Sequence, residues 1–132
     1  MRTVTYHLAT TATTFTAALA QLTIVRDGRI VGARISWCGI AGGGGTFLGQ
    51  VDLSHNSQTT YSSYNDPPRF STLTHAVVYA AAASAMNAFA MPYVPLSVPC
   101  KAGDVIYLNA ANGGGAAPTT SVLTADLWVT EA

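Results

Sequence analysis

The sequence predicts an all-β domain built as an antiparallel sandwich. Hydrophobic and polar residues alternate in several short segments, and glycine-rich or proline-rich stretches separate these segments. No amphipathic helix of the kind that joins parallel strands is recognisable between them. Because 132 residues is the length of one ordinary domain, we expect residues 1–132 to form a single unit.

The first predicted strands lie within residues 20–38. Hydrophobic residues alternate with others at Leu22, Ile24, Val31, Ala33, Ile35 and Trp37. The pair Asp27-Gly28 lies between the two runs, and such a pair flanked by alternating hydrophobic residues favours a type I′ turn. We therefore expect a β-hairpin over residues 20–38, with Trp37 in the core.

A third strand is predicted over residues 46–53, where Phe47, Gly49, Val51 and Leu53 share one face. The four glycines at 42–45 lie before it. They lack the Gly-Lys-Ser/Thr ending of a phosphate-binding loop, and no clear helix follows them. We interpret this glycine run as a flexible loop.

Residues 54–69 are rich in Ser, Asn, Gln, Thr and Tyr and end with two prolines, which predicts a long exposed loop. Long loops in compact domains are often functional, and Tyr and Arg are enriched at protein interfaces. Tyr61, Tyr64 and Arg69 are therefore candidate contact residues. A loop without a binding role is the alternative.

The stretch 73–91 is ambiguous, because Val77, Val78 and Tyr79 favour a strand whereas the alanines at 80–83 favour a helix. The prolines at 92, 95 and 99 favour short extended segments. We expect strands here and keep one short helix around residues 73–90 as an open alternative.

Two further strands are predicted near the C-terminus, at 105–108 and 121–130, separated by a loop around the glycines at 113–115. In the last strand Leu123, Ala125, Leu127 and Val129 share one face. Trp128 lies on the opposite face of this strand, and either face of the strand could be the one turned to the core. Trp128 is a further candidate contact residue. The succession of short strands favours a jelly-roll-like sandwich.

Residues 98–108, Val-Pro-Cys-Lys-Ala-Gly-Asp-Val-Ile-Tyr-Leu, together with residues 125–131, Ala-Asp-Leu-Trp-Val-Thr-Glu, resemble the last strands of compact jelly-roll proteins. Such endings occur in decoration, spike and fibre-head proteins of tailed bacteriophages, and in trimeric tumour-necrosis-factor-like and C1q-like modules. The resemblance implies a structural role in a virion, as a homotrimer attached to a major capsid or other virion protein. It implies localisation in the virion after synthesis in the host cytoplasm, and no receptor-binding residue is carried over from it.

The composition points in the same direction, because only 9% of residues are charged and 49% are hydrophobic, against a typical charged fraction of roughly 25%. Small uncharged side chains must cover the surface, and burying them desolvates no charge and loses little entropy. We therefore expect the surface to be covered by neighbouring protein. A neutral, hydroxyl-rich secreted or surface module is the alternative.

Several other classes are disfavoured. Six basic and six acidic residues give no net charge, so we expect no nucleic-acid partner. The first residues show no apolar signal segment, which is the basis for expecting cytoplasmic synthesis. The longest apolar run, 76–91, is shorter than the roughly 20 residues of a membrane span, so we expect no membrane partner.

The sequence offers few groups for catalysis. His7, His55 and His75 are widely separated and form no known catalytic or zinc motif. Asp52 with His55, joined in space by Asp66 or His75, is the nearest approach to a metal site; we favour a solvated pair in a loop. Asp104, which follows a glycine, is a calcium candidate that we expect to cap a turn. We therefore predict no enzyme, no cofactor and no metal.

Two observations stay open. Cys38 and Cys100 match no zinc or redox spacing and are interpreted as small buried hydrophobic residues, with a disulfide between them undecided. The alternative function is a carbohydrate-binding or receptor-binding module, in which Trp128 and the loop tyrosines stack on sugar rings.

Overall fold

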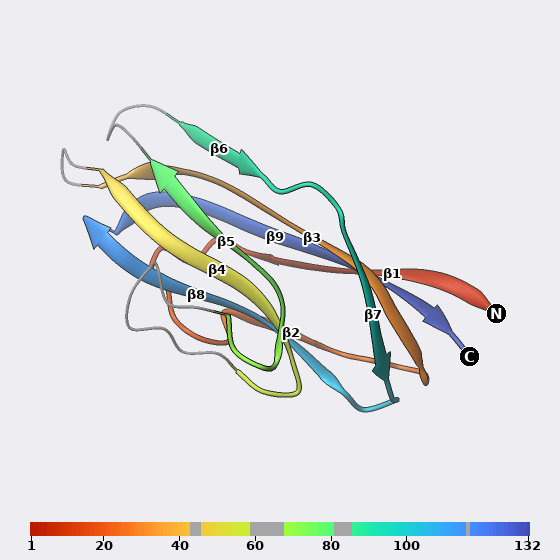
Figure 1. The fold of residues 1–132 in the computed structure, drawn as a ribbon. Coiled ribbons are helices and arrows are strands. Elements are labelled where there is room, and N and C mark those ends of the chain that lie inside the picture. Colours follow the sequence, from red (N-terminus) through yellow and green to blue (C-terminus); the bar gives the residue numbers. More distant parts are fainter. Residues whose placement is uncertain (43–45, 59–67, 81–85, 116) are drawn as a thin grey trace.

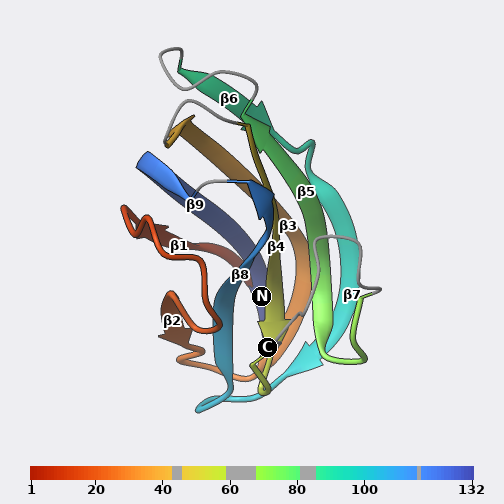
Figure 2. The ribbon, with the colours of Figure 1, turned by 90° about the vertical axis from the view of Figure 1, so that its left-hand side faces the viewer.

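The computed structural model describes residues 1–42, 46–58, 68–80, 86–115 and 117–132. These residues form two antiparallel sheets packed face to face as a sandwich (Figures 1 and 2). The predicted all-β sandwich is confirmed. Within the described ranges no helix is present, and none is therefore long and apolar enough to cross a membrane.

The first sheet has the order β1-β9-β3-β6, and β7 also pairs with β3. Its strands are β1 (Arg2–Thr10), β9 (Pro118–Glu131), β3 (Gly28–Ala41), β6 (Asn87–Ala90) and β7 (Val94–Cys100). The second sheet has the order β2-β8-β4-β5. Its strands are β2 (Ala20–Thr23), β8 (Val105–Gly115), β4 (Phe47–His55) and β5 (Thr72–Ala80). Most connections cross from one sheet to the other, as in a jelly roll.

The core lies between the sheets and follows the alternation of β3, β4, β8 and β9. Trp37 and Phe47 are the largest fully buried side chains, with ring centroids 5.7 Å apart. Phe15, from the segment between β1 and β2, packs edge-on against Phe47 at 5.1 Å. The indole N–H of Trp37 donates a hydrogen bond of 2.9 Å to Ser121 Oγ, so its burial leaves no donor unsatisfied. The prediction that Trp37 lies in the core is confirmed.

The hairpin predicted over residues 20–38 is wrong. β2 pairs with β8 in the second sheet, whereas β3 lies in the first sheet. Neither Asp27 nor Gly28 has a positive φ, so no type I′ turn forms. Asp27 instead accepts a hydrogen bond from the Ala102 amide at 2.9 Å. Gly28 is required by a close strand contact, because a Cβ there would lie 2.2 Å from the Thr130 carbonyl oxygen.

Other parts of the chain differ from the prediction or settle a point that the sequence left open. Residues 112–115, expected in a loop, belong to β8 and pair with β4. The ambiguous stretch 73–91 contributes β5 and β6, while residues 81–85 lie outside the described residues. β7 accommodates Pro95 and Pro99 because it pairs only with β3. Val31, expected to face the core, is half-buried because the register of β3 shifts between Ile30 and Gly32.

Candidate functional site

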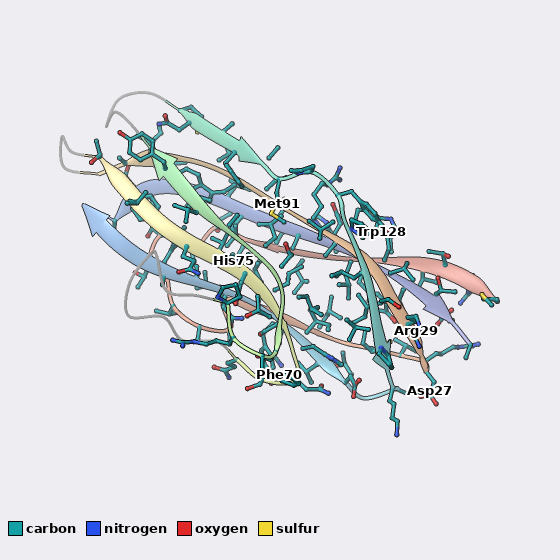
Figure 3. The ribbon with its side chains drawn as sticks, viewed as in Figure 1. Asp27, Arg29, Phe70, His75, Met91 and Trp128 are labelled. Carbon is teal, nitrogen blue, oxygen red and sulfur yellow. The ribbon has the colours of Figure 1, made fainter. Side chains whose placement is uncertain are left out.

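The candidate site is the outer face of the first sheet, which is the surface turned away from the core. The registers of β1, β9, β3 and β6 define it, because directly opposite residues point to the same side of a sheet. Its members are Thr3, Thr5, His7, Ala9, Arg29, Arg34, Ser36, Cys38, Ala88, Ala90, Val122, Thr124, Asp126, Trp128 and Thr130. Trp128 therefore lies on the outside of the sandwich, beside Tyr93 (Figure 3).

An ion-paired row crosses the middle of this face. His7 on β1, Asp126 on β9 and Arg34 on β3 are in register with one another. His7 Nδ1 lies 2.7 Å from Asp126 Oδ1, and Arg34 Nη2 donates to Asp126 Oδ2 at 3.0 Å. Burial alone would raise the pKa of Asp126, but these hydrogen bonds and the charges of His7 and Arg34 outweigh burial and hold the pKa below its ordinary value. The one carboxylate of the row is therefore compensated on both sides.

An aromatic pair forms the next row. Trp128 is opposite Gly32, and the ring of Tyr93 lies over that glycine. Tyr93 contacts Trp128 edge-on with 5.1 Å between ring centroids, and its hydroxyl donates a 2.8 Å hydrogen bond to the Val31 carbonyl. The Arg34 guanidinium lies 5.8 Å from the centroid of the Trp128 ring, within reach of a cation–π interaction. Trp128 is thus held by neighbours within the sheet.

Small side chains form the rest of the face toward β6. They surround a shallow hollow of about 220 Å³. Its outward lining residues are Ser36, Cys38, Ala88, Ala90, Val122 and Thr124. None of these side chains is charged, and Val122 is 43% exposed. This part of the face is small-featured and uncharged, which suits close approach of another protein surface.

Arg69, another candidate contact residue, does not lie on this face. Arg69 is exposed and lies just before β5, in the second sheet, and its amide donates to Thr72 Oγ1 at 3.0 Å. Tyr61 and Tyr64 lie outside the described residues. Of the predicted contact residues that the structure describes, Trp128 lies on the outer face and Arg69 does not. His7, Arg34, Asp126 and Tyr93 were not selected from the sequence as candidate contact residues, although alternation along β9 places Asp126 and Trp128 on one side.

Of the groups considered for a metal site, Asp52 and His55 are separated by the pleat of β4. Asp52 is fully buried and accepts a 2.8 Å hydrogen bond from Asn109 Nδ2, on the side of β4 opposite to His55. His75 is the register partner of Asp52, and Asp66 lies outside the described residues. Among the described residues there is no group of three or more His, Cys, Asp or Glu side chains that could hold a metal ion.

His55 instead pairs with Asp104, with 2.8 Å between Nε2 and Oδ2. Asp104 also accepts a 2.9 Å hydrogen bond from the Lys101 amide, so it caps the turn before β8. Burial would raise the pKa of Asp104, but the hydrogen bonds with Lys101, His55 and Asn56 hold it below its ordinary value. The pair ties the end of β4 to the turn between β7 and β8.

A cavity of about 520 Å³ lies where β3, β7 and β9 meet. Asp27 and Arg29, which are labelled in Figure 3, are among its lining residues. Cys100 is one of its lining residues. The pKa of the Cys100 thiol is raised, mainly by burial and to a smaller extent by the carboxylates of Asp104 and Asp27. A thiol held in its protonated form is a poor nucleophile. Glu131, also in the lining, is engaged by Arg2 at 2.9 Å.

The two cysteines are free, and the register of β3 explains why they do not pair. Cys100 is opposite Gly28, and Cys38 lies ten residues further along the same strand. At about 3.3 Å per residue this places them roughly 33 Å apart, far beyond the reach of a disulfide. Cys100 is buried as expected, whereas Cys38 is only half-buried, on the outer face.

No known family model matches the sequence, and no curated protein matches it. Among solved structures, a protein of the disulfide-linked pili that form Bacillus endospore appendages has 15% sequence identity and a TM-score of 0.37, over 98% of this chain and 89% of that chain. The tumour necrosis factor Eiger from S. frugiperda has 13% identity and a TM-score of 0.42, over 86% of this chain and 67% of that chain. Both are β-rich proteins to which this chain is distantly similar in fold.

Proposed function

We propose that this chain is a non-enzymatic structural subunit that assembles with other copies of itself through the outer face of the first sheet. The observation that carries the proposal is the compensation of charge on that face. Asp126 is hydrogen-bonded by both His7 and Arg34, so a neighbour can cover the row without leaving a buried carboxylate unpaired. Leaving such a charge unpaired would be strongly destabilising.

The remaining side chains of the face support the same function. Most are Ala, Ser, Thr, Cys or Val, which lose little conformational entropy when they are covered. Trp128 and Tyr93 supply the large aromatic surface that is enriched in the cores of interfaces. The low charge of the whole chain, 9% of residues, fits an exterior that is partly covered in the working state.

In its more specific form, the proposal makes this chain a decoration, spike or minor capsid subunit of a tailed bacteriophage. The partner would then be a major capsid protein or another virion protein, and a trimer would be the expected oligomer. This form is supported by the resemblance of residues 98–108 and 125–131 to the endings of such proteins, and by the jelly-roll order of the strands. Its mechanism is passive, through burial of surface between subunits.

Light scattering coupled to size exclusion tests the assembly. We expect a stable multiple of 13.7 kDa at micromolar concentration. Thr124→Arg would place a long charged side chain over the shallow hollow and should shift the protein toward a smaller mass. Thr23→Arg, at an exposed position of β2 in the other sheet, is the matched control and should leave the mass unchanged. A wild-type protein of 13.7 kDa under these conditions would overturn the proposal.

The carbohydrate-binding alternative is less well supported by the surroundings of Trp128. Its ring makes a T-shaped contact with Tyr93 and lies beneath the Arg34 guanidinium, whereas a sugar-stacking platform needs an open ring face. Saturable glycan binding that Trp128→Ala abolishes, by a protein that stays monomeric, would favour this alternative over self-assembly.

A further inference from the structure

β1 forms one edge of the first sheet. It pairs with β9 along all nine of its residues without a register shift. Figure 2 shows it at the margin of the sheet, with no strand of the described residues pairing on its other side. In an antiparallel ladder, alternate residues direct both backbone polar groups away from the partner strand. A row of N–H and C=O groups therefore points outward from β1, and no backbone hydrogen bond from a described turn or loop reaches it.

Most other edges of the sandwich are blunted in ways that discourage pairing. β2 and β6 have only four residues each. β7 carries Pro95 and Pro99, which cannot donate to a ladder. β5 contacts β3 and β6 of the opposite sheet. β1 has no proline, no bulge and no lysine, and these are the features by which proteins protect an exposed edge.

The inward side of β1 is also incompletely covered. Val4, Tyr6 and Leu8 face the interior, but Val4 and Tyr6 are only half-buried. β2, which lies nearest to β1 in the opposite sheet, has four residues against nine. Apolar surface therefore remains next to the unpaired backbone edge, so that a strand added there would complete both the ladder and the core.

We propose that β1 pairs antiparallel with β1 of a second copy of this chain, which joins the two first sheets into one. The proposal rests on the proposed self-assembly and adds to it a second contact, at the edge of the same sheet, with its own register and symmetry. A shift of one residue would turn the inward side chains outward, so inward residues must face inward residues. Of the registers that satisfy this condition, the one centred on Tyr6 pairs all nine residues.

This register is chemically self-complementary. On the inner side, Val4 lies opposite Leu8 of the partner subunit, and Tyr6 lies opposite Tyr6 of the partner subunit. On the outer side, Thr3 lies opposite Ala9 of the partner subunit, and Thr5 opposite His7 of the partner subunit. Arg2, the one formally charged residue of the strand, meets Thr10 of the partner subunit, so no like charges are opposed. The same patch is used by both copies, as a closed twofold interface requires.

Cysteine pairing between two different single variants tests this register. In a Cys38→Ser background, which removes the half-buried thiol, Thr3→Cys and Ala9→Cys chains are co-expressed and treated with a mild oxidant. We expect a two-chain disulfide product from the mixture. Each variant alone is the matched control and should give little product, because two copies of the same position would lie six residues, or about 20 Å, apart along the paired strands.

Light scattering on the same samples separates failure of this proposal from failure of self-assembly. An oligomer without cross-linked product in the mixture, or one with equal product in the single variants, would overturn the β1 pairing and leave self-assembly intact. A mass of three chains would do the same, because a twofold interface alone builds even-numbered assemblies. The β1 pairing therefore follows from self-assembly in general and competes with the trimer expected of the bacteriophage form. A monomer would overturn both proposals.

Discussion

The ring of Tyr93 occupies the space above Gly32, where any other residue would carry its Cβ. Such an atom would lie 2.1 Å from two carbon atoms of the ring and from the hydroxyl oxygen. The glycine lies at the register shift of β3, and the tyrosine hydroxyl bonds to the Val31 carbonyl within that shift. Tyr93 therefore covers the glycine, fixes the irregular backbone beside it and supports Trp128 from one side.

Replacing this glycine should destabilise the fold through overpacking. We expect Gly32→Ala to lower the free energy of unfolding by about 1–3 kcal/mol, measured by urea denaturation. Tyr93→Ala should also destabilise the protein, but in the double variant the two effects should not add, because the clash disappears with the ring. Additive effects would show that the ring and the glycine do not contact each other in solution.

Alternation in the sequence identifies the buried face of β9 and predicts that Trp37 lies in the core. It places Trp128 on the face of β9 opposite to Leu127, and the strand order of the structure shows that this face is turned outward. It does not identify the sheet to which a strand belongs. β2 and β3 face the same core from opposite sides, so a crossing between sheets gives the same pattern as a hairpin. The ion-paired row was missed for a related reason, since Asp126 is 119 residues from His7 and 92 from Arg34. Only the strand order brings these residues together.

A buried amide on the other side of the sandwich should be important for stability. Asn109 is fully buried, and its Nδ2 donates to Asp52 Oδ1 and Ser54 Oγ, each at 2.8 Å, while its Oδ1 accepts from the Ala18 amide at 2.8 Å. We expect Asn109→Ala to lower the free energy of unfolding by roughly 3 kcal/mol, because it leaves several buried groups with fewer partners. Chemical denaturation measures this.

Two further variants serve as controls for Asn109. Gln21→Ala, at an exposed position of β2, should change stability by less than about 0.5 kcal/mol. Asn109→Asp keeps the shape but places a second carboxyl group against Asp52, so its destabilisation should diminish as the pH is lowered and one carboxyl binds a proton. A pH-independent effect of this variant would argue against the contact with Asp52.

Acid should destabilise the protein through Asp104 and Asp126. Their pKa values in the folded chain are held below the ordinary value, so the unfolded chain binds more protons in the intervening pH range. Their stabilising contribution is complete above the ordinary pKa of about 3.9 and is lost as the pH falls through the lower, folded values. The free energy of unfolding, measured by denaturation at a series of pH values, should therefore fall less steeply toward acid pH for Asp126→Asn than for the wild type. If the free energy of unfolding of both proteins depended on acid pH in the same way, the ion-paired row would not favour the ionised carboxylate of Asp126.

Cys38 offers a direct probe of the outer face, because it lies beside Val122 and Ala88 in the shallow hollow, whereas Cys100 is buried. In a dilute, dissociated sample we expect a thiol reagent to modify Cys38 first. Cys100 should react slowly, since burial raises the pKa of its thiol and restricts access. As the protein concentration rises and subunits associate, the rate at Cys38 should fall while that at Cys100 stays constant, as followed by mass spectrometry. If an assembled sample reacts at Cys38 as fast as a dilute one, the subunits associate through another surface, because a covered face excludes the reagent from the hollow that contains this thiol.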